Sequence, residues 1–285
     1  MGAHTETDSR PRVAAFQFDV RRGEVQANLA RVEEGLREAA SRGISLVVLP
    51  EMWPTSFVDL EEFDARWLPE TQAALEHVSN LSAELDLMVA GSSFAPGDLG
   101  QRPRNRLLLV DRGEELIAYD KVHLFTPTAE AEAFSAGDKE PPTVDTRLGK
   151  ISCGLCYDLR FPWLFRGSYL SGAEIIVLPA QWPATRAPHW SGLVTGRAVE
   201  CQAYVIACNR TGVDHIGRRR LELSFPGNSF LVGPHGDVLA AGTGAEGLVE
   251  AQLDMDGMRR LRRQVPVRRD DRADLYSAWS EIRES

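Results

Sequence analysis

Residues 44–50 read ISLVVLP, a run of branched and leucine side chains, and an acidic residue, Glu51, follows it directly. A short apolar run of this kind is typical of a strand that is covered on both faces of a sheet. A second run of the same type, EIIVLP, stands at residues 174–179. Around both runs, strand-like segments alternate with segments whose apolar residues have helical spacing. This alternation predicts the α/β class, with helices that cover a sheet.

The first half of the chain contains five expected strands and two expected helices. The strands are expected at residues 12–18, 44–50, 87–94, 105–111 and 115–120, and the last two should form a hairpin. The helices are expected at residues 24–42 and 69–86. In the first helix, one apolar face that should pack on the sheet consists of Leu29, Val32, Leu36 and Ala39.

The second half repeats this rhythm. Strands are expected at residues 150–155, 174–179, 203–208, 228–232 and 248–253, the last two around a turn at 235–237. Helices are expected at residues 162–172, 189–202 and in the arginine-rich segment after 254. Because no Gly/Ser linker separates the halves, we expect one domain over 12–276, a flexible N-terminus over 1–11 and a C-terminal tail over 277–285.

The composition and net charge exclude some classes of binding partner. The 285 residues are 43% hydrophobic and 26% charged, which favours an ordinary globular protein over a disordered or fibrous one. The net charge of −9 has the wrong sign for binding nucleic acid or an anionic membrane surface. No apolar run approaches the ~20 residues that span a bilayer, and the N-terminus is polar where a secretory signal is apolar. We therefore expect a cytoplasmic location.

Three residues with different chemistry each follow the end of an expected strand: Glu51, Lys121 and Cys156. Ligand sites of α/β sheets form along the carboxyl edge of the strands, so these residues can converge there. Each alone has an ordinary interpretation, as a helix-capping acid, a loop cation or a small buried residue. Together they supply a thiol nucleophile, a base for its proton and an ammonium for a developing oxyanion, which is the set that acyl transfer requires.

The cysteines allow a second interpretation, because Cys153 and Cys156 form a C-x-x-C pair. In a redox pair, both thiols are expected beyond the end of the strand. Cys153 instead falls inside the expected strand and should pack in the core. Cys201 and Cys208 stand seven apart and offer no matching pair for a zinc site. The sequence therefore favours reduced thiols and an acyl-transfer role for Cys156.

The local sequences around these residues resemble the three active-site motifs of the nitrilase superfamily, the carbon-nitrogen hydrolases. They are LPE at 49–51, YDKVHLF at 119–125 and GLCYDLRFP at 154–162. The resemblance continues through QWP at 181–183, GRAVECQAY at 196–204, CNR at 208–210 and DRADLY at 271–276. Several motifs in the correct order are far more specific than any one of them. The resemblance implies an αββα sandwich that forms an αββα-αββα homodimer or a larger even-numbered assembly, with neither a metal nor an organic cofactor.

The family roles transfer to this chain position by position. The resemblance implies that Cys156 is the nucleophile, Glu51 the general base and Lys121 the oxyanion-stabilising ammonium. The family also places a second glutamate after the lysine motif, and the spacing favours Glu130 over Glu132. The backbone N–H of Tyr157 is the expected second oxyanion donor, because the chain should turn sharply after the strand.

The residues after Cys156 resemble the omega-amidase branch, whereas nitrile-cleaving members continue with Trp-Glu. This predicts hydrolysis of an amide of a small carboxylic acid, such as 2-oxoglutaramate, to the acid and ammonia. A remote carboxylate needs a fixed cation, for which we select Arg186, beside Trp182. Arg160 is expected to pair near Asp158 and brace the turn. The alternatives are deaminated glutathione, neutral aliphatic amides, N-carbamoyl compounds, a nitrile, or a non-catalytic member that serves as a binding module.

Overall fold

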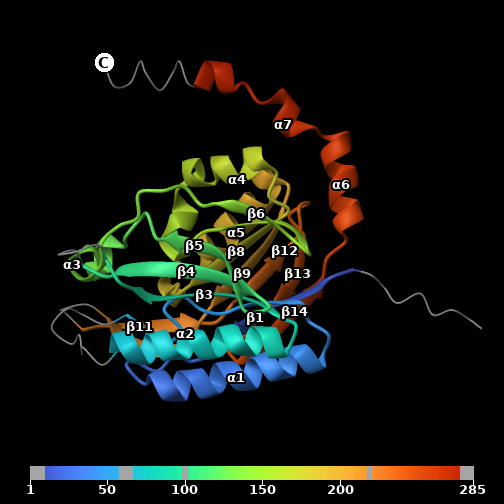
Figure 1. Ribbon diagram of the computed structural model, residues 1–285. Helices are drawn as coiled ribbons and strands as arrows, with labels where there is room; N and C mark the ends of the chain where they lie inside the picture. The colour runs from blue at the N-terminus through green and yellow to red at the C-terminus, as the bar shows by residue number, and fades with distance from the viewer. Residues whose placement is uncertain (1–9, 58–66, 98–101, 217–219, 277–285) are drawn as a thin grey trace, which may run out of the picture.

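The computed structural model describes residues 10–57, 67–97, 102–216 and 220–276 of the chain. Two six-stranded sheets are stacked face to face, with helices over their outer faces (Figure 1). The expected α/β class is confirmed. Most of the expected N-terminal segment and all of the expected C-terminal tail lie outside the described residues.

The first sheet has the strand order β14-β1-β2-β3-β4-β5. Its strands are β1 (Arg12–Gln17), β2 (Leu46–Val48), β3 (Met88–Ala95), β4 (Arg104–Asp111), β5 (Glu114–Asp120) and β14 (Gly247–Gln252). Strands β1, β2 and β3 are parallel, and the outer pairs are antiparallel. The helices α1 (Val25–Ser41) and α2 (Trp67–Glu84) cover its outer face, where Val32, Leu36 and Ala39 are fully buried and Leu29 is partly buried. The predicted apolar face of the first helix is therefore confirmed.

The second sheet has the order β13-β12-β9-β8-β7-β6. Its strands are β6 (Thr143–Thr146), β7 (Gly149–Cys153), β8 (Ile175–Ala180), β9 (Tyr204–Asn209), β12 (Phe230–Val232) and β13 (Val238–Ala241). The helices α4 (Arg166–Ser171) and α5 (Ala187–Cys201) belong to this half of the sandwich, and α5 packs on β9. Strands β7, β8 and β9 are parallel, so both sheets have a parallel centre.

The core between the sheets follows from the alternation of side chains along each strand. In β1, Val13 and Ala15 face the opposite sheet, whereas Ala14 and Phe16 face the helices. Each of these side chains is fully buried. Complete burial of a valine or phenylalanine stabilises the fold by about 1.5–3 kcal/mol, so strands with two apolar faces hold the four layers together.

Some elements differ from the expectation. The turn at 235–237 leads from β12 to β13, a strand that was not expected. The expected strand at 248–253 corresponds to β14, which lies beside β1 in the other sheet. Strand β6 and the hairpin β10 (Thr211–Ile216) and β11 (Leu221–Pro226) were also not expected. Strands β6 and β10 lack the apolar alternation that marks a half-buried strand, whereas β11 has it at Leu221, Leu223 and Phe225 and was missed. The chain after Asp254 forms α6 (Met255–Gln264) and α7 (Val267–Asp270), as expected. Among the described helices, none has the length and apolar character to cross a membrane.

Candidate active site

The predicted reactive residues converge where the two sheets meet. Glu51 lies just beyond β2 and Lys121 just beyond β5, both in the first sheet, whereas Cys156 lies just beyond β7 in the second. The N–H of Glu51 donates to the carbonyl of Ala180 across the sheets, at 3.4 Å. The site is thus assembled from both halves of the sandwich.

Lys121 is the centre of a buried charged cluster. Its Nζ lies 2.8 Å from Glu51 Oε1 and 2.9 Å from both carboxylate oxygens of Glu130. Glu130 begins the short helix α3 (Glu130–Ala133), and the N–H of Phe125 donates to its Oε2 at 2.6 Å. These three charged side chains are at most 4% exposed, whereas Glu132 is exposed. The structure therefore places Glu130, and not Glu132, against the lysine.

Cys156 occupies a sharp turn between β7 and the 3-10 helix η2 (Cys156–Arg160). Its φ of 41° lies in the left-handed region, which costs energy for a residue other than glycine. Gly154 permits the close packing before this turn, because a Cβ there would lie 2.7 Å from the ring of Phe165. The Sγ atom contacts the carbonyl of Gln181 at 3.7 Å. The N–H of Tyr157 lies in the first turn of the helix, where amides have no intrahelical partner.

The burial of this cluster sets the direction of each pKa shift. Burial raises the pKa of Glu51, and the charge of Glu130 adds to this effect while Lys121 opposes it. Burial acts to lower the pKa of Lys121, but the charges of Glu130 and Glu51 outweigh it and raise that pKa. Burial and the charge of Glu51 raise the pKa of Cys156. The thiol is therefore protonated at rest, beside a carboxylate that can take its proton and a permanent cation.

Two polar residues that the sequence did not single out hold Glu51 in place. Asn105, in β4, donates from Nδ2 to Glu51 Oε1 at 2.9 Å and to Glu130 Oε1 at 3.4 Å. Gln181 donates its backbone N–H to Glu51 Oε2 at 3.1 Å and its side-chain amide to the Glu51 carbonyl at 2.8 Å. The signal for Gln181 was its place in the QWP motif, whereas no feature of the local sequence marked Asn105.

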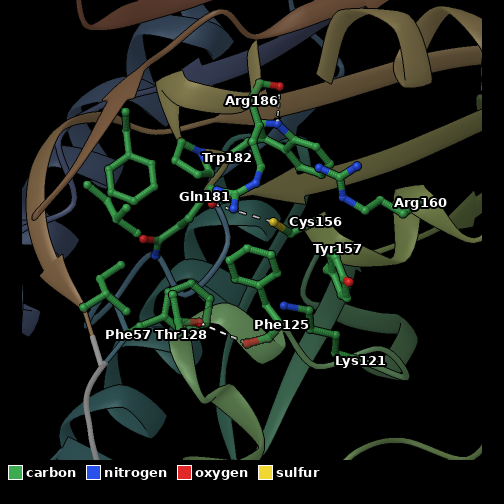
Figure 2. Close-up of a pocket in the computed structure, with 14 residues that line it drawn as sticks. Phe57, Lys121, Phe125, Thr128, Cys156, Tyr157, Arg160, Gln181, Trp182 and Arg186 are labelled. Atoms are coloured by element: carbon green, nitrogen blue, oxygen red, sulfur yellow. Dashed lines mark hydrogen bonds between the residues drawn. The ribbon is translucent and has the colours of Figure 1, made fainter. Parts of the chain in front are cut away.

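One pocket opens onto Cys156 and Lys121, and both predicted substrate-binding residues line it (Figure 2). The indole N–H of Trp182 donates to the carbonyl of Arg186 at 2.9 Å, and the Arg186 guanidinium lies 5.5 Å from the ring centroid of Phe125. The hairpin β10–β11 contributes an apolar wall that consists of Ile216, Leu223 and Phe225. The pocket thus combines apolar surfaces with a few cations.

The expectation for Arg160 was wrong. Its guanidinium lies 4.7 Å from the ring centroid of Trp182 and lines the pocket, with both terminal nitrogens 3.3 Å from His189 Nδ1. Asp158 binds other groups, on β5 and the segment after it. Residues two apart on a helix do not share a face, so Asp158 points inward while Arg160 reaches the pocket.

The C-x-x-C pair does not form a redox site in this structure. Cys153 is the last residue of β7, and its side chain is fully buried between the two sheets, as expected. All four cysteines are free. Only Cys156 among them lines the pocket.

A model of the carbon-nitrogen hydrolase family matches residues 12–263. The chain therefore belongs to the carbon-nitrogen hydrolase family. It is 31% identical over 265 residues to the 2-oxoglutaramate amidase of Bacillus subtilis, covering 93% of this chain and 98% of that relative. It is 32% identical over 254 residues to the omega-amidase YafV of Escherichia coli strain K12, covering 89% of this chain and 93% of that relative. The resemblance inferred from the motifs, and the amidase activity expected from it, are confirmed.

Solved structures of amidases have the same fold. An amidase from Nesterenkonia sp. superimposes with a TM-score of 0.80 at 26% identity, covering 95% of this chain and 96% of that one. Another structure of that enzyme, an engineered variant, shows covalent addition of the acetamide moiety of fluoroacetamide at its active-site cysteine, at 25% identity, with a TM-score of 0.80 and coverage of 95% and 97%. These neighbours therefore include an enzyme whose cysteine reacts with a small amide.

Proposed function

We propose that the protein is an omega-amidase that hydrolyses the terminal amide of a short dicarboxylic acid monoamide through a thioester on Cys156. The observation that carries this proposal is the cluster of Glu51, Lys121 and Glu130 beside a thiol that opens into a pocket lined by two arginines. The names of the relatives, which include 2-oxoglutaramate amidases, support a 2-oxo acid as the substrate.

Acylation uses the three groups in sequence. Glu51 accepts the proton of the Cys156 thiol, and the sulfur attacks the amide carbon. The carbonyl oxygen becomes an oxyanion, which the Lys121 ammonium and the N–H of Tyr157 stabilise. Glu51 then transfers the proton to the departing nitrogen, the carbon-nitrogen bond breaks, and ammonia leaves. The raised pKa of Glu51 suits a group that must both take and return a proton near neutral pH.

Deacylation repeats these steps with water. Glu51 takes a proton from a water molecule, whose oxygen attacks the thioester carbon, and the oxyanion again faces Lys121. The carbon-sulfur bond then breaks, the sulfur recovers the proton, and the carboxylic acid is released. Glu130 holds Lys121 through both steps, because its two oxygens contact Nζ at 2.9 Å.

The remote carboxylate of the substrate is bound by Arg186, with Arg160 as a second cation of the same pocket. Within the described part of the chain, neither guanidinium forms an ion pair, and both lie against aromatic rings. In Figure 2, Lys121 lies on one side of Cys156 and the two arginines on the other. A substrate with an amide at one end and a carboxylate at the other fits between these groups.

An ammonia-release assay tests this proposal with 2-oxoglutaramate, glutamine, propionamide, a simple nitrile and N-carbamoylalanine. We expect the highest kcat/KM for 2-oxoglutaramate. A charge-assisted contact in a water-poor site contributes about 2–4 kcal/mol, equal to about 30- to 1000-fold in kcat/KM when the transition state makes it. Equal kcat/KM for 2-oxoglutaramate and propionamide would refute the carboxylate-binding site.

Variants of Arg186 separate its charge from its shape. Arg186→Ala should remove most of the preference for 2-oxoglutaramate and leave the activity on propionamide unchanged. Arg186→Lys should restore part of the preference, because it keeps the charge without the bidentate geometry. If Arg186→Ala lost activity on both amides, Arg186 would be needed for the structure of the site and not for binding the carboxylate.

We also propose that two copies associate through the helical layer of α4 and α5. Three large apolar side chains are exposed on these helices and on the 3-10 helix just before α4: Trp163 is 66%, Leu170 41% and Val199 47% exposed. Gly192 and Gly196 leave open space on the surface of α5, where a second backbone can approach closely. An apolar surface of this kind favours a two-fold interface.

A further inference from the structure

Asp158 is a buried carboxylate that takes no part in the steps above. It is fully buried, yet neither Arg nor Lys pairs with it among the described residues. Four groups converge on its two oxygens: Oδ2 accepts from the Tyr119 hydroxyl at 2.8 Å and the Leu155 N–H at 3.1 Å. Oδ1 contacts the backbone N–H of His123 at 3.0 Å and its Nδ1 at 2.8 Å. Both oxygens of this buried carboxylate are therefore occupied by groups from two separate segments of the chain.

We propose that Asp158 is a positioning residue that fixes the distance between the nucleophile and the oxyanion-stabilising ammonium. Two of its partners, Tyr119 in β5 and His123 in the segment after it, stand two residues before and two residues after Lys121. Asp158 therefore holds the chain on both sides of Lys121. This inference rests on the roles proposed for Cys156 and Lys121.

The same carboxylate fixes the turn that carries Cys156. Its contact with the N–H of Leu155 closes the start of the 3-10 helix, one residue before the nucleophile. The far end of that helix is also held, because the ring of His123 stacks on Phe161 with the centroids 3.6 Å apart. The two segments that must face the same oxyanion are thus joined through one side chain and one ring pair.

The chemistry requires a carboxylate at this position. Asp158 is an acceptor only, and burial together with its charge raises the pKa of Tyr119, so that hydroxyl remains a donor. Asparagine has the same shape but presents an NH₂ group to one pair of donors. Whichever way that amide faces, either the N–H of Leu155 or the N–H of His123 loses its acceptor. The substitution therefore loosens one of the two segments without changing the volume of the side chain.

The experiment compares two reactions of the same thiol in Asp158→Asn. Amide hydrolysis requires the oxyanion site, whereas alkylation of Cys156 by iodoacetamide displaces iodide and forms no oxyanion. We expect kcat for 2-oxoglutaramate to fall about tenfold or more, because small misplacements of catalytic groups have large effects. The rate of alkylation, followed by mass spectrometry of the Cys156 peptide, should stay within about threefold of the unmodified protein. KM should change less than kcat.

Asp120→Asn is the matched control. Asp120 immediately precedes Lys121, and its carboxylate binds Arg106 at 2.7 and 2.9 Å instead of the nucleophile turn. This variant should keep both rates. Tyr119→Phe, which removes one of the four contacts, should reduce kcat selectively and by a smaller factor, and it tests the proposal if Asp158→Asn does not fold.

The outcomes separate this inference from the proposed function. A parallel fall of hydrolysis and alkylation in folded Asp158→Asn, or in Tyr119→Phe, would show a merely structural role and overturn the inference. Unchanged hydrolysis in either variant would overturn it as well. If alkylation of Cys156 in the unmodified protein left hydrolysis intact, the proposed function itself would fail.

Discussion

Replacing Glu130 with glutamine tests how the buried cluster sets the strength of the base. Glu51 and Glu130 contact the same Lys121 nitrogen at 2.8 and 2.9 Å, so the contacting oxygens lie within about 6 Å of each other. Burial is the main reason that the pKa of Glu51 is raised, and the negative charge of Glu130 raises it further. Glu130→Gln keeps the shape and removes that charge.

The size of the effect follows from this separation. Two unit charges about 6 Å apart interact by about 3 kcal/mol at an effective dielectric constant of about 20. This energy opposes the ionisation of Glu51 for as long as Glu130 carries its negative charge. Removing a negative neighbour makes Glu51 easier to ionise, so its pKa should fall.

The assay is the pH dependence of kcat/KM for amide hydrolysis. Because the free enzyme needs Glu51 deprotonated, the acid limb of the profile should move to lower pH in Glu130→Gln. The maximal rate should also fall, because Lys121 loses two charge-assisted contacts. Glu132→Gln is the control: this exposed glutamate stands two residues further on, and its variant should keep the original profile. An acid limb that stays in place, or moves to higher pH, would refute the reasoning.

The remaining predictions concern the nucleophile, the cluster and the assembly. Cys156→Ala should abolish turnover while Cys153→Ala stays active, and the reverse result would refute the assignment. Glu51→Gln should lower kcat by orders of magnitude because it removes the proposed base. Lys121→Arg should lower kcat as strongly, because it puts a planar guanidinium in the place of a compact ammonium. A near-normal rate in Lys121→Arg would contradict the proposed role of Lys121. Light scattering at micromolar concentration should show a homodimer or larger even-numbered assembly, and an active species that is strictly monomeric would contradict the proposed interface.

The sequence predicted the parts of the site that lie next to strand ends. Glu51, Lys121 and Cys156 each follow an apolar strand, and the rule for the carboxyl edges of α/β sheets was enough to bring them together. Asn105 was not predictable in this way. It lies at the start of β4, and its contact with Glu51 depends on the antiparallel register of β3 and β4, which local sequence does not encode.

The hairpin β10–β11 escaped prediction for a different reason. Apolar and polar residues alternate in β11 but not in β10, and the position of the hairpin over the pocket depends on a buried arginine, Arg210. The guanidinium of Arg210 binds Asp214 at 3.0 Å, Ser56 at 2.9 Å and the side chain of Gln181 at 3.1 Å. These contacts join segments far apart in the chain. Polar networks of this kind are specified by the assembled fold and leave no periodic pattern in the sequence.

The four cysteines show why burial alone does not make a nucleophile. Burial raises the pKa of every one of them, to about 11 in the case of Cys201. Burial by itself therefore makes these thiols less reactive, since the thiolate is the attacking form. Cys156 differs because, in the proposed mechanism, Glu51 accepts its proton and Lys121 stabilises the charge that appears on the substrate.

The proposed base, Glu51, comes from the opposite sheet. Gln181, at the end of β8, contacts both the thiol of Cys156 and the carboxylate of Glu51, so it ties the nucleophile to its base across the sandwich. The reactivity of Cys156 is consequently a property of the packed sheets and not of its own turn. We therefore expect a change that separates the sheets slightly, even far from the pocket, to weaken catalysis.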